Sequence, residues 1–270
     1  MTNELHQPLK LRFLLTGKCT ARCAYCHNEG QTKEAAQLRL PVIAMILETL
    51  ETAGHLPDEI ILSGGEPTLN RELGSIARLC KSTGTVVSLD THAGHPRLLE
   101  PALPYLDEMK VHIDSFDPIT QRQSMGIEIC NVLTSIRLAK QFPALQIVAN
   151  HPLQRIDDTR DFVEQARILG VDCKVIEMFR FGTSHITPDW KNFGYTQQIK
   201  GHWLHEDGQH RIFTKRCDAE HNLDNSLFIG ADGIRRAVDG VIIGQAEDFS
   251  ARMLHCHALS RRTAEIARAA

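Results

Sequence analysis

Six short apolar segments alternate with helical segments over the first two thirds of the chain. We predict strands at 10–16, 59–62, 85–89, 109–113, 145–149 and 173–177. We predict helices at 40–52 and at about 70–82, 96–105, 127–141 and 157–169. Continuous apolar strands separated by helices indicate a parallel sheet covered by helices, with right-handed crossovers. Six such units are fewer than the eight of a closed barrel, so a partial, open barrel and a doubly wound sheet both fit.

The pattern changes after about residue 182. Residues 183–210 contain both tryptophans and show little periodicity. Residues 211–243 contain strand-forming runs around Asp232-Gly233, and an Asp-Gly pair between such runs is a strong hairpin signal. One or two helices are expected from about Glu247 to the end. We therefore expect two parts, with the strand–helix units in residues 1–182 and an extension that covers the substrate in residues 183–270.

Composition argues against several classes of protein. The formal charge of -3 gives no general attraction to nucleic acid or to an anionic membrane. No apolar run approaches the roughly 18 residues that span a bilayer, and residues 1–8 lack the features of a signal peptide. We therefore expect a cytoplasmic protein without nucleic-acid or membrane partners. In that reducing compartment the eight cysteines are not expected to form disulfides, and the isolated Cys80 and Cys130 are expected to be buried.

Three of the cysteines crowd into the loop after the first strand. Cys19, Cys23 and Cys26 lie within eight residues of one another. Such crowding of soft thiolates suits one metal centre, usually zinc or an iron–sulfur cluster. A structural zinc site needs a fourth ligand, and His27, next to Cys26, is poorly placed to be one. Three thiolates on a four-iron cluster would instead leave one iron open for chemistry.

Polar residues follow the five later strands, at the edge where parallel sheets bind ligands. The segments are Ser63-Gly64-Gly65-Glu66-Pro67, Asp90-Thr91-His92, Asp114-Ser115, Asn150-His151 and Glu177-Met178-Phe179-Arg180. Paired glycines allow backbone to approach a ligand closely, and Glu66 can accept hydrogen bonds from an ammonium group. Each segment alone is more often a turn or a helix cap, as Asp117 before Pro118 is expected to be. Their occurrence together, above a cysteine cluster, favours a binding site.

Two motifs together resemble a known superfamily. Cys19-x3-Cys23-x2-Cys26, with Tyr25 before the third cysteine, resembles the signature of the radical S-adenosylmethionine superfamily. Ser63-Gly64-Gly65-Glu66-Pro67, about 40 residues later, resembles its second hallmark. The resemblance covers roughly residues 10–182. It implies a partial (βα)6 TIM-like barrel, and with the pattern after residue 182 we expect an α/β fold in which this barrel is followed by a small C-terminal hairpin-plus-helix extension.

The resemblance also implies the cofactors and the chemistry. A [4Fe–4S] cluster would be held by Cys19, Cys23 and Cys26, and S-adenosylmethionine would bind the open iron through its amino and carboxylate groups. Reductive cleavage would give methionine and a 5′-deoxyadenosyl radical, which abstracts hydrogen from a substrate. The barrel would exclude water and position the substrate while the cofactor does the difficult chemistry. A reductase such as flavodoxin or ferredoxin would be a partner.

The superfamily's motifs also imply which residues bind the cosubstrate. They are Tyr25, Gly64, Gly65, Glu66, Ser88, Asp90, Thr91, Asp114, Ser115 and Asn150. The Gly-Gly-Glu group matches the motif that holds the methionine ammonium, and the tyrosine matches the aromatic whose backbone meets the adenine. Ser88, Asp90 and Thr91 fall where the superfamily often contacts the methionine carboxylate or the ribose. Asp114, Ser115 and Asn150 match positions that commonly touch the ribose or the adenine. Asp90-Thr91-His92-Ala93-Gly94 departs from the usual Thr-Asn-Gly.

Several fragments are similar to the branch that contains the GTP cyclase of molybdenum cofactor biosynthesis. They are residues 23–30, 113–118 and 175–182. That branch carries a second three-cysteine cluster near its C-terminus. Here Cys217 and Cys256 are the late cysteines, and Ala237 stands where a ligand would follow. We therefore expect the hairpin shape without its metal and a different substrate, with an auxiliary cluster completed by His or Asp as the alternative.

We expect a radical S-adenosylmethionine enzyme that acts on a small polar substrate, phosphorylated or nucleotide-like, in a biosynthetic pathway. One alternative is an activating enzyme of a glycyl-radical protein, which Cys26-His27-Asn28 and Leu89-Asp90-Thr91 also resemble. Another is a peptide-modifying enzyme, although nine residues before the first strand leave no room for a leader-binding domain. Outside enzymes, an iron–sulfur electron carrier or a zinc-stabilised binding protein would have no use for Gly64-Gly65-Glu66-Pro67.

Further side chains are hypothesised to contact the substrate. Those expected to point into the barrel are His92, His112, Arg122, Glu177 and Arg180. Those expected to approach from the extension are Arg216, Arg235 and Arg236. Arginine at such positions would suit a phosphate or a carboxylate, whereas paired arginines on a hairpin are equally expected on a solvated face.

Overall fold

A computed structural model describes residues 9–26, 33–34, 36–153, 155–177, 188–199, 202–216, 226–231, 234–237 and 242–245. Its parallel strands are β1 (Lys10–Leu14), β2 (Glu59–Ser63), β3 (Val86–Thr91), β4 (Glu108–His112), β5 (Gln146–Leu153), β6 (Asp172–Glu177), β9 (Arg211–Arg216) and β10 (Ser226–Gly230). Its antiparallel strands are β7 (Tyr195–Ile199), β8 (His202–His205), β11 (Ile234–Ala237) and β12 (Ile242–Gln245).

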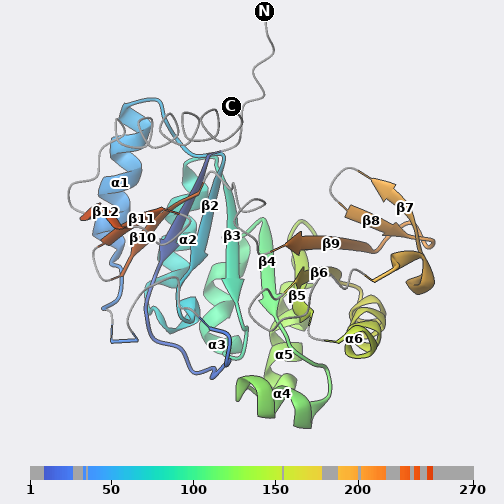
Figure 1. Cartoon of the computed structure of the whole chain (residues 1–270). Helices are drawn as coiled ribbons and strands as arrows, with labels where there is room; N and C mark the ends of the chain where they lie inside the picture. Colours follow the sequence, from blue (N-terminus) through green and yellow to red (C-terminus); the bar gives the residue numbers. More distant parts are fainter. Residues whose placement is uncertain are drawn as a thin grey trace, which may run out of the picture.

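Within these ranges the strands form one sheet in the order β12-β11-β10-β1-β2-β3-β4-β5-β6-β9-β8-β7 (Figure 1). All pairs from β10 to β9 are parallel. The α-helices are α1 (Leu40–Thr52), α2 (Leu73–Ser82), α3 (Pro96–Leu99), α4 (Pro118–Met125), α5 (Ile129–Ala139) and α6 (Ile156–Leu169). Short 3₁₀ helices are η2 (Pro67–Leu69), η3 (Glu100–Tyr105) and η5 (Trp190–Phe193).

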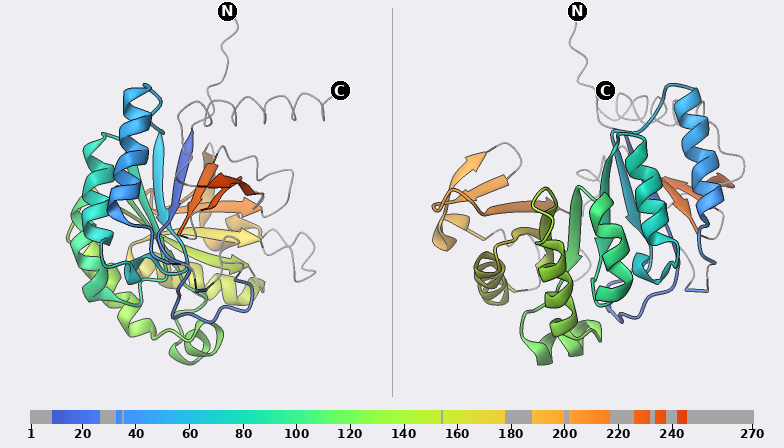
Figure 2. Two further views of the ribbon diagram at one scale, coloured as in Figure 1. Left: turned by 90° about the vertical axis from the view of Figure 1, so that its left-hand side faces the viewer. Right: turned by 180° about the vertical axis from the view of Figure 1, so that it is seen from behind.

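The helices α1, α2 and α5 lie along one face of the sheet (Figure 2). Successive side chains of a strand point to opposite faces, so Leu11 and Phe13 of β1 are fully buried in the core that includes Ile43 of α1. Arg12, between them, points to the other face. This inner face of the sheet is therefore where polar side chains from β1 to β4 gather.

The parallel sheet with intervening helices confirms the expected α/β class. The bounds of α1 are the predicted ones, and Asp117 caps α4, its carboxylate accepting the backbone N–H of Thr120 at 2.8 Å. The helix α4 itself was not predicted, because its eight residues are mostly polar. Cys80 is buried as expected, but Cys130 is exposed, so that expectation is wrong. No helix in the described part of the chain is long and apolar enough to cross a membrane.

Strands from the expected extension join the barrel sheet at both edges. β10 pairs in parallel with β1, and β9 pairs in parallel with β6. The predicted hairpin appears as β10 and β11, which pair antiparallel. Its turn at 232–233 and the helices expected after residue 246 lie outside the described residues. The division of the chain at residue 182 stays a prediction.

Candidate active site

The cysteine loop leaves β1 and is fixed by backbone contacts on two sides. Gly65 and Glu66, after β2, donate their backbone N–H groups to the carbonyls of Thr16 at 2.6 Å and Lys18 at 2.8 Å. Farther along the loop, the N–H of Arg22 donates to the carbonyl of Met125 at 2.8 Å. The loop is thus held between the end of β2 and the end of α4.

The glycines after β2 permit this contact with the loop. A Cβ atom on Gly65 would lie 2.3 Å from the carbonyl oxygen of Lys18, and one on Gly64 would lie 2.6 Å from that of Thr16. Gly64 also has φ of +135°, a conformation that side chains rarely adopt. The close approach predicted for these glycines is therefore made to the cysteine loop, and an approach to a ligand stays a prediction.

The three cysteines present thiols in different environments. Cys19 and Cys23 are half-buried and Cys26 is exposed. Burial raises the pKa of the Cys19 thiol to about 11 and that of Cys23 to about 12. Both thiols therefore carry protons in the absence of a metal, and metal binding would displace them.

The described cysteines do not by themselves form a ready-made site for a single metal ion. Within the described ranges, no three His, Cys, Asp or Glu side chains converge as ligands of one metal ion do. A structural zinc ion requires four such ligands around one point. In a four-iron cluster each thiolate binds a different iron, so its ligands stand apart.

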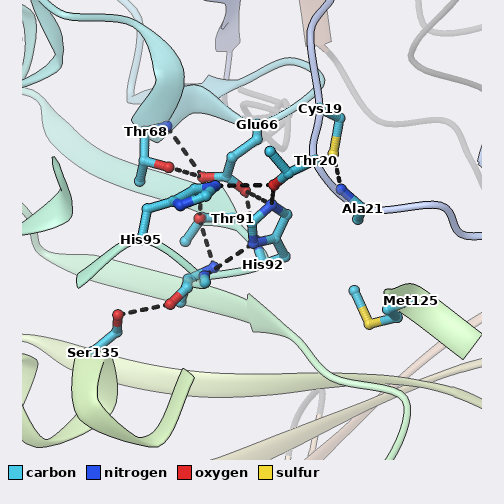
Figure 3. A network of polar contacts seen from close by, with 12 residues as sticks. Cys19, Thr20, Ala21, Glu66, Thr68, Thr91, His92, His95, Met125 and Ser135 are labelled. Atoms are coloured by element: carbon cyan, nitrogen blue, oxygen red, sulfur yellow. Dashed lines mark hydrogen bonds and ion pairs between the residues drawn. The ribbon is translucent and has the colours of Figure 1, made fainter. Parts of the chain in front are cut away.

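Glu66, itself fully buried, is the acceptor at the centre of a polar cluster, which we call the Glu66 cluster (Figure 3). Its members are Thr20, Glu66, Thr68, Thr91, His92 and His95. The Oε1 atom of Glu66 accepts the backbone N–H of Thr68 at 3.1 Å and the hydroxyls of Thr68 and Thr91, each at 2.6 Å. Its Oε2 atom accepts the backbone N–H of His92 at 2.9 Å and lies 3.2 Å from Nε2 of the same residue.

Among the described residues, Glu66 has no permanently charged cationic partner. The side chain is fully buried, and its five contacts come from groups that are neutral when His92 is neutral. Burial is the largest influence on His92 and lowers its pKa below the ordinary value. Among the described residues no lysine or arginine pairs with Glu66. Because a buried carboxylate is costly without a cation, this geometry fits an ammonium group of a ligand.

A second cluster, the Tyr25 cluster, joins the cysteine loop to β4 and consists of Tyr25, His112 and Asp114. The Tyr25 hydroxyl donates to Oδ1 of Asp114 and lies 2.7 Å from Nε2 of His112. Burial and the Asp114 carboxylate raise the pKa of Tyr25. The backbone N–H groups of Asp114 and Ser115 both donate to the buried Gln121 at 3.0 Å. The predicted residues Tyr25, Asp114 and Ser115 are thus brought together.

Two predicted residues carry buried oxygens that lack a donor. They are Oδ2 of Asp114 and Oδ1 of Asn150, which have no hydrogen-bond partner in the described structure. Asn150 lies within β5 and pairs in register with His112 of β4, and Asp114 follows two residues after His112. Buried polar atoms are normally satisfied. Hydroxyl or amino groups of a ligand such as S-adenosylmethionine would fit both oxygens.

Ser88 and Asp90 lie in a third group, the inner-face cluster, with Lys10, Arg12, Glu59, Glu108 and Lys110. Asp90 pairs with Arg12, and Lys110 lies 3.2 Å from Glu59 and 2.8 Å from Glu108. The hydroxyl of Ser88 donates to Glu59 at 2.6 Å. Burial raises the pKa of Asp90, but the nearby charges of Arg12 and Lys110 outweigh this effect and lower the pKa to about 2. Asp90 lies inside β3, so the structure places it and Ser88 among ion pairs, separate from the Glu66 cluster.

Of the side chains hypothesised to contact the substrate, two lie in the clusters described above and one does not point into the barrel. His92 and His112 lie in the Glu66 and Tyr25 clusters. Arg122 does not point into the barrel, because it lies on α4, largely exposed, and pairs with Glu128 at 2.6 Å. Other positions lie outside the described residues or lack a described side chain: Glu177, Arg180, Arg216, Cys217, Arg235, Arg236 and Cys256.

Sequence reasoning missed Thr20, Thr68 and His95, which complete the Glu66 cluster. Thr20 contacts His92 and His95 across more than 70 residues of sequence. Such contacts depend on the fold and leave no local pattern. The departure of Asp90-Thr91-His92-Ala93-Gly94 from the usual motif was the one available signal.

A sequence comparison decides the family. The profile described as Radical SAM superfamily matches residues 13–164, more than half of the chain. The chain belongs to the radical SAM superfamily. The resemblance based on the cysteine loop and on the Gly-Gly-Glu segment is thereby confirmed. Enzymes of this superfamily use a [4Fe–4S] cluster and S-adenosylmethionine, the two cofactors that the resemblance implied.

Two curated relatives cover different shares of the chain. A probable GTP 3',8-cyclase from Methanocella arvoryzae is 33% identical over 109 residues, which are 40% of this chain and 34% of that protein. A putative glycyl-radical enzyme activating enzyme from Methanocaldococcus jannaschii is 27% identical over 171 residues, which are 60% of this chain and 69% of that protein. The chain therefore spans about a third of the cyclase relative.

A solved structure shows the same fold. The structure of Streptococcus suis SuiB bound to S-adenosylmethionine matches with a TM-score of 0.66 and 14% identity. The match covers 90% of this chain and 62% of SuiB. At this identity the likeness concerns the fold alone. It confirms the partial TIM-like barrel and decides against a doubly wound sheet.

Proposed function

We propose that this chain cleaves S-adenosylmethionine reductively and uses the product to abstract hydrogen from a small polar substrate. The observation that carries the proposal is Glu66, a fully buried carboxylate with five contacts and no described lysine or arginine partner, beside the cysteine loop. An ammonium group of a ligand would complete it. A carrier protein or a structural zinc protein has no need of such a group.

Each part of the site has a task in this proposal. Cys19, Cys23 and Cys26 would hold the cluster, and Glu66 would bind the methionine ammonium. The unpartnered oxygens of Asp114 and Asn150 would accept ribose hydroxyls or the adenine amino group. When bound by these cysteines, a [4Fe–4S] cluster would pass one electron from a flavodoxin- or ferredoxin-type reductase to S-adenosylmethionine, which would give methionine and a 5′-deoxyadenosyl radical. The surrounding barrel would position the substrate and exclude water.

The inner-face cluster supports a polar substrate. TIM-type barrels are usually filled by branched apolar side chains. Here the side chains of Arg12, Asp90 and Lys110 are 15%, 25% and 13% exposed, so solvent reaches charged groups. From the extension, Phe228 lies against Arg12, whose guanidinium carbon is 5.4 Å from the ring centre. This contact supports the proposal that residues 183–270 cover the substrate.

An activating enzyme of a glycyl-radical protein is the second candidate. Its support is the Methanocaldococcus jannaschii relative, of which this chain covers 69%. A cell extract separated by dialysis discriminates the two candidates. The small-molecule fraction should stimulate formation of 5′-deoxyadenosine if the substrate is a metabolite, and the retained fraction should do so if it is a protein.

Product analysis tests the activity itself. Protein reconstituted anaerobically with iron and sulfide, then given dithionite and S-adenosylmethionine, should release 5′-deoxyadenosine. Cys23→Ala should lose both iron and product, whereas Glu66→Gln should keep iron and lose product. Full iron loading of the wild type without any 5′-deoxyadenosine would contradict the proposal.

A further inference from the structure

The tautomer of His92 follows from its contacts. Its Nδ1 atom accepts the backbone N–H of Gly94 at 2.9 Å. A neutral imidazole carries one proton, so the proton of His92 lies on Nε2. That N–H group faces Oε2 of Glu66 at 3.2 Å and Oγ1 of Thr20 at 3.1 Å. His92 therefore offers one donor at the point where Glu66 would receive an ammonium group.

The turn that carries His92 is built around its ring. A Cβ atom on Gly94 would lie 3.0 Å from two atoms of the imidazole. Ala93 has φ of +54°, which is uncommon for a residue other than glycine. This conformation is held by the Thr91 hydroxyl, which accepts the N–H of Ala93 at 2.9 Å, and by Ser135, which donates to its carbonyl at 2.7 Å. The ring of His92 is fixed in place before any ligand arrives.

An amino-acid ligand brings a carboxylate next to its ammonium, and that carboxylate needs donors. Ser88 and Asp90 of the third strand, which the resemblance implied as contacts of this carboxylate, are unsuited to bind it. Asp90 is an anion paired with Arg12, and the hydroxyl of Ser88 is used by Glu59. Among the described residues, the donors that remain beside Glu66 are His92 and Thr20, with His95 2.9 Å from the Thr20 hydroxyl.

We propose that His92, together with Thr20 and His95, binds the carboxylate of the amino-acid moiety whose ammonium binds Glu66. The ammonium takes the Oε2 lone pair that His92 now uses, because Oε1 already accepts three donors. The Nε2–H group of His92 is then released to the adjacent carboxylate. The contact between His92 and Glu66 is thus replaced by two contacts with the zwitterion, one from its ammonium to Glu66 and one from its carboxylate to His92. This inference rests on the proposed function and deepens its binding site.

Matched variants and matched ligands test the assignment by equilibrium dialysis of the reconstituted protein. The ligands are S-adenosylmethionine and its decarboxylated form, which keeps the ammonium. His92→Asn keeps an acceptor near Nδ1 but has no donor at Nε2, whereas His92→Gln carries an amide N–H that reaches farther. We expect His92→Asn to lower the preference for the carboxylated ligand by about tenfold, as loss of a charge-assisted hydrogen bond should. His92→Gln should retain most of the preference.

The outcomes separate the two proposals. If His92 has only a structural role, His92→Asn should weaken the binding of both ligands equally. The preference for the carboxylated ligand would then stay unchanged, and the inference would be wrong. Thr20→Val should reduce the preference and Thr20→Ser should restore it. If wild type with a full cluster binds neither ligand, the proposed function itself fails. If it binds and cleaves S-adenosylmethionine while His92→Asn leaves the preference intact, the carboxylate assignment alone fails.

Discussion

The inner-face cluster and the Glu66 cluster treat carboxylates in opposite ways. On the inner face, Glu59, Asp90 and Glu108 each pair with a lysine or an arginine. Beside the cysteine loop, Glu66 is more deeply buried and has no such partner among the described residues. Charges that neutralise one another hold the strands together, whereas an uncompensated carboxylate is prepared for a cation that comes from outside. The comparison separates charge that is already neutralised within the fold from charge that is left open for the ammonium of a ligand.

Gly65→Ala should have the largest effect, because it disrupts the region that holds the cysteine loop and leaves the inner face untouched. The added Cβ would lie 2.3 Å from a backbone carbonyl, which cannot rotate away. We expect the variant to lose most of its iron and about 3 kcal/mol of stability. Gly54→Ala is the control, since no atom lies within 4 Å of its Cβ and only its φ of +69° opposes the change. Normal iron content in Gly65→Ala would contradict the role assigned to this contact.

The same substitution at two glutamates sharpens the comparison most directly. Glu66→Gln should weaken S-adenosylmethionine binding by about 100-fold, because it removes the charge that faces the ammonium. Glu59→Gln should leave binding nearly unchanged but lower stability by about 2 kcal/mol, because Lys10 and Lys110 lose their partner. Calorimetric binding and thermal unfolding of both variants measure the two effects. If Glu66→Gln and Glu59→Gln weakened S-adenosylmethionine binding equally, the distinction between the two carboxylates would be wrong.

Lys110→Met tests whether the inner-face charges are structural. We expect a loss of about 3 kcal/mol, because three carboxylates lose a shared cation. In the wild type the pKa values of Glu59 and Asp90 are lowered to about 2 from 4.5 and 3.8. Their stabilisation is therefore present above the ordinary values and is lost as pH falls towards 2.

The dependence of unfolding free energy on pH below 5 tests the role of Lys110. Denaturant unfolding between pH 5 and pH 2 should show wild-type stability falling with pH and a shallower fall in Lys110→Met, whose carboxylates titrate nearer their ordinary values. Parallel curves for the two proteins would show that Lys110 does not set those pKa values.

Tyr25→Phe should have the smallest effect of this series. The change removes the hydroxyl that joins the loop to Asp114 and His112. We expect a loss of about 1 kcal/mol and binding of S-adenosylmethionine weakened by about threefold, without loss of iron. Tyr105→Phe, on η3, is the control. A complete loss of the cluster in Tyr25→Phe would mean that the Tyr25 cluster holds the loop more strongly than its contacts indicate.

Sequence patterns predicted the elements whose two faces differ in polarity. Helix α1 begins and ends as expected because its apolar spacing is regular and Pro41 lies in its first turn. Strand β3 was ended two residues early because Asp90 and Thr91 are polar, yet Asp90 faces ion pairs on the inner face. A polar inner face removes the apolar signal on which strand prediction depends.

The candidate site was predictable where a motif is local in sequence. Cys19, Cys23 and Cys26, and likewise Gly64 to Glu66, are short motifs. The partners of Glu66 were not predictable in the same way, because Thr20 and His92 meet through tertiary packing. The sign of the charge around Asp90 also required the fold, since Arg12 lies 78 residues earlier.

Binding of a ligand that lacks the ammonium tests the central account most directly. S-adenosylmethionine and its deaminated analogue should be titrated against reconstituted wild type and Glu66→Gln. The account predicts that wild type binds the analogue about 100-fold more weakly than S-adenosylmethionine, and that Glu66→Gln binds the two about equally. Equal discrimination by both proteins would contradict the assignment of Glu66 as the residue that awaits the ammonium.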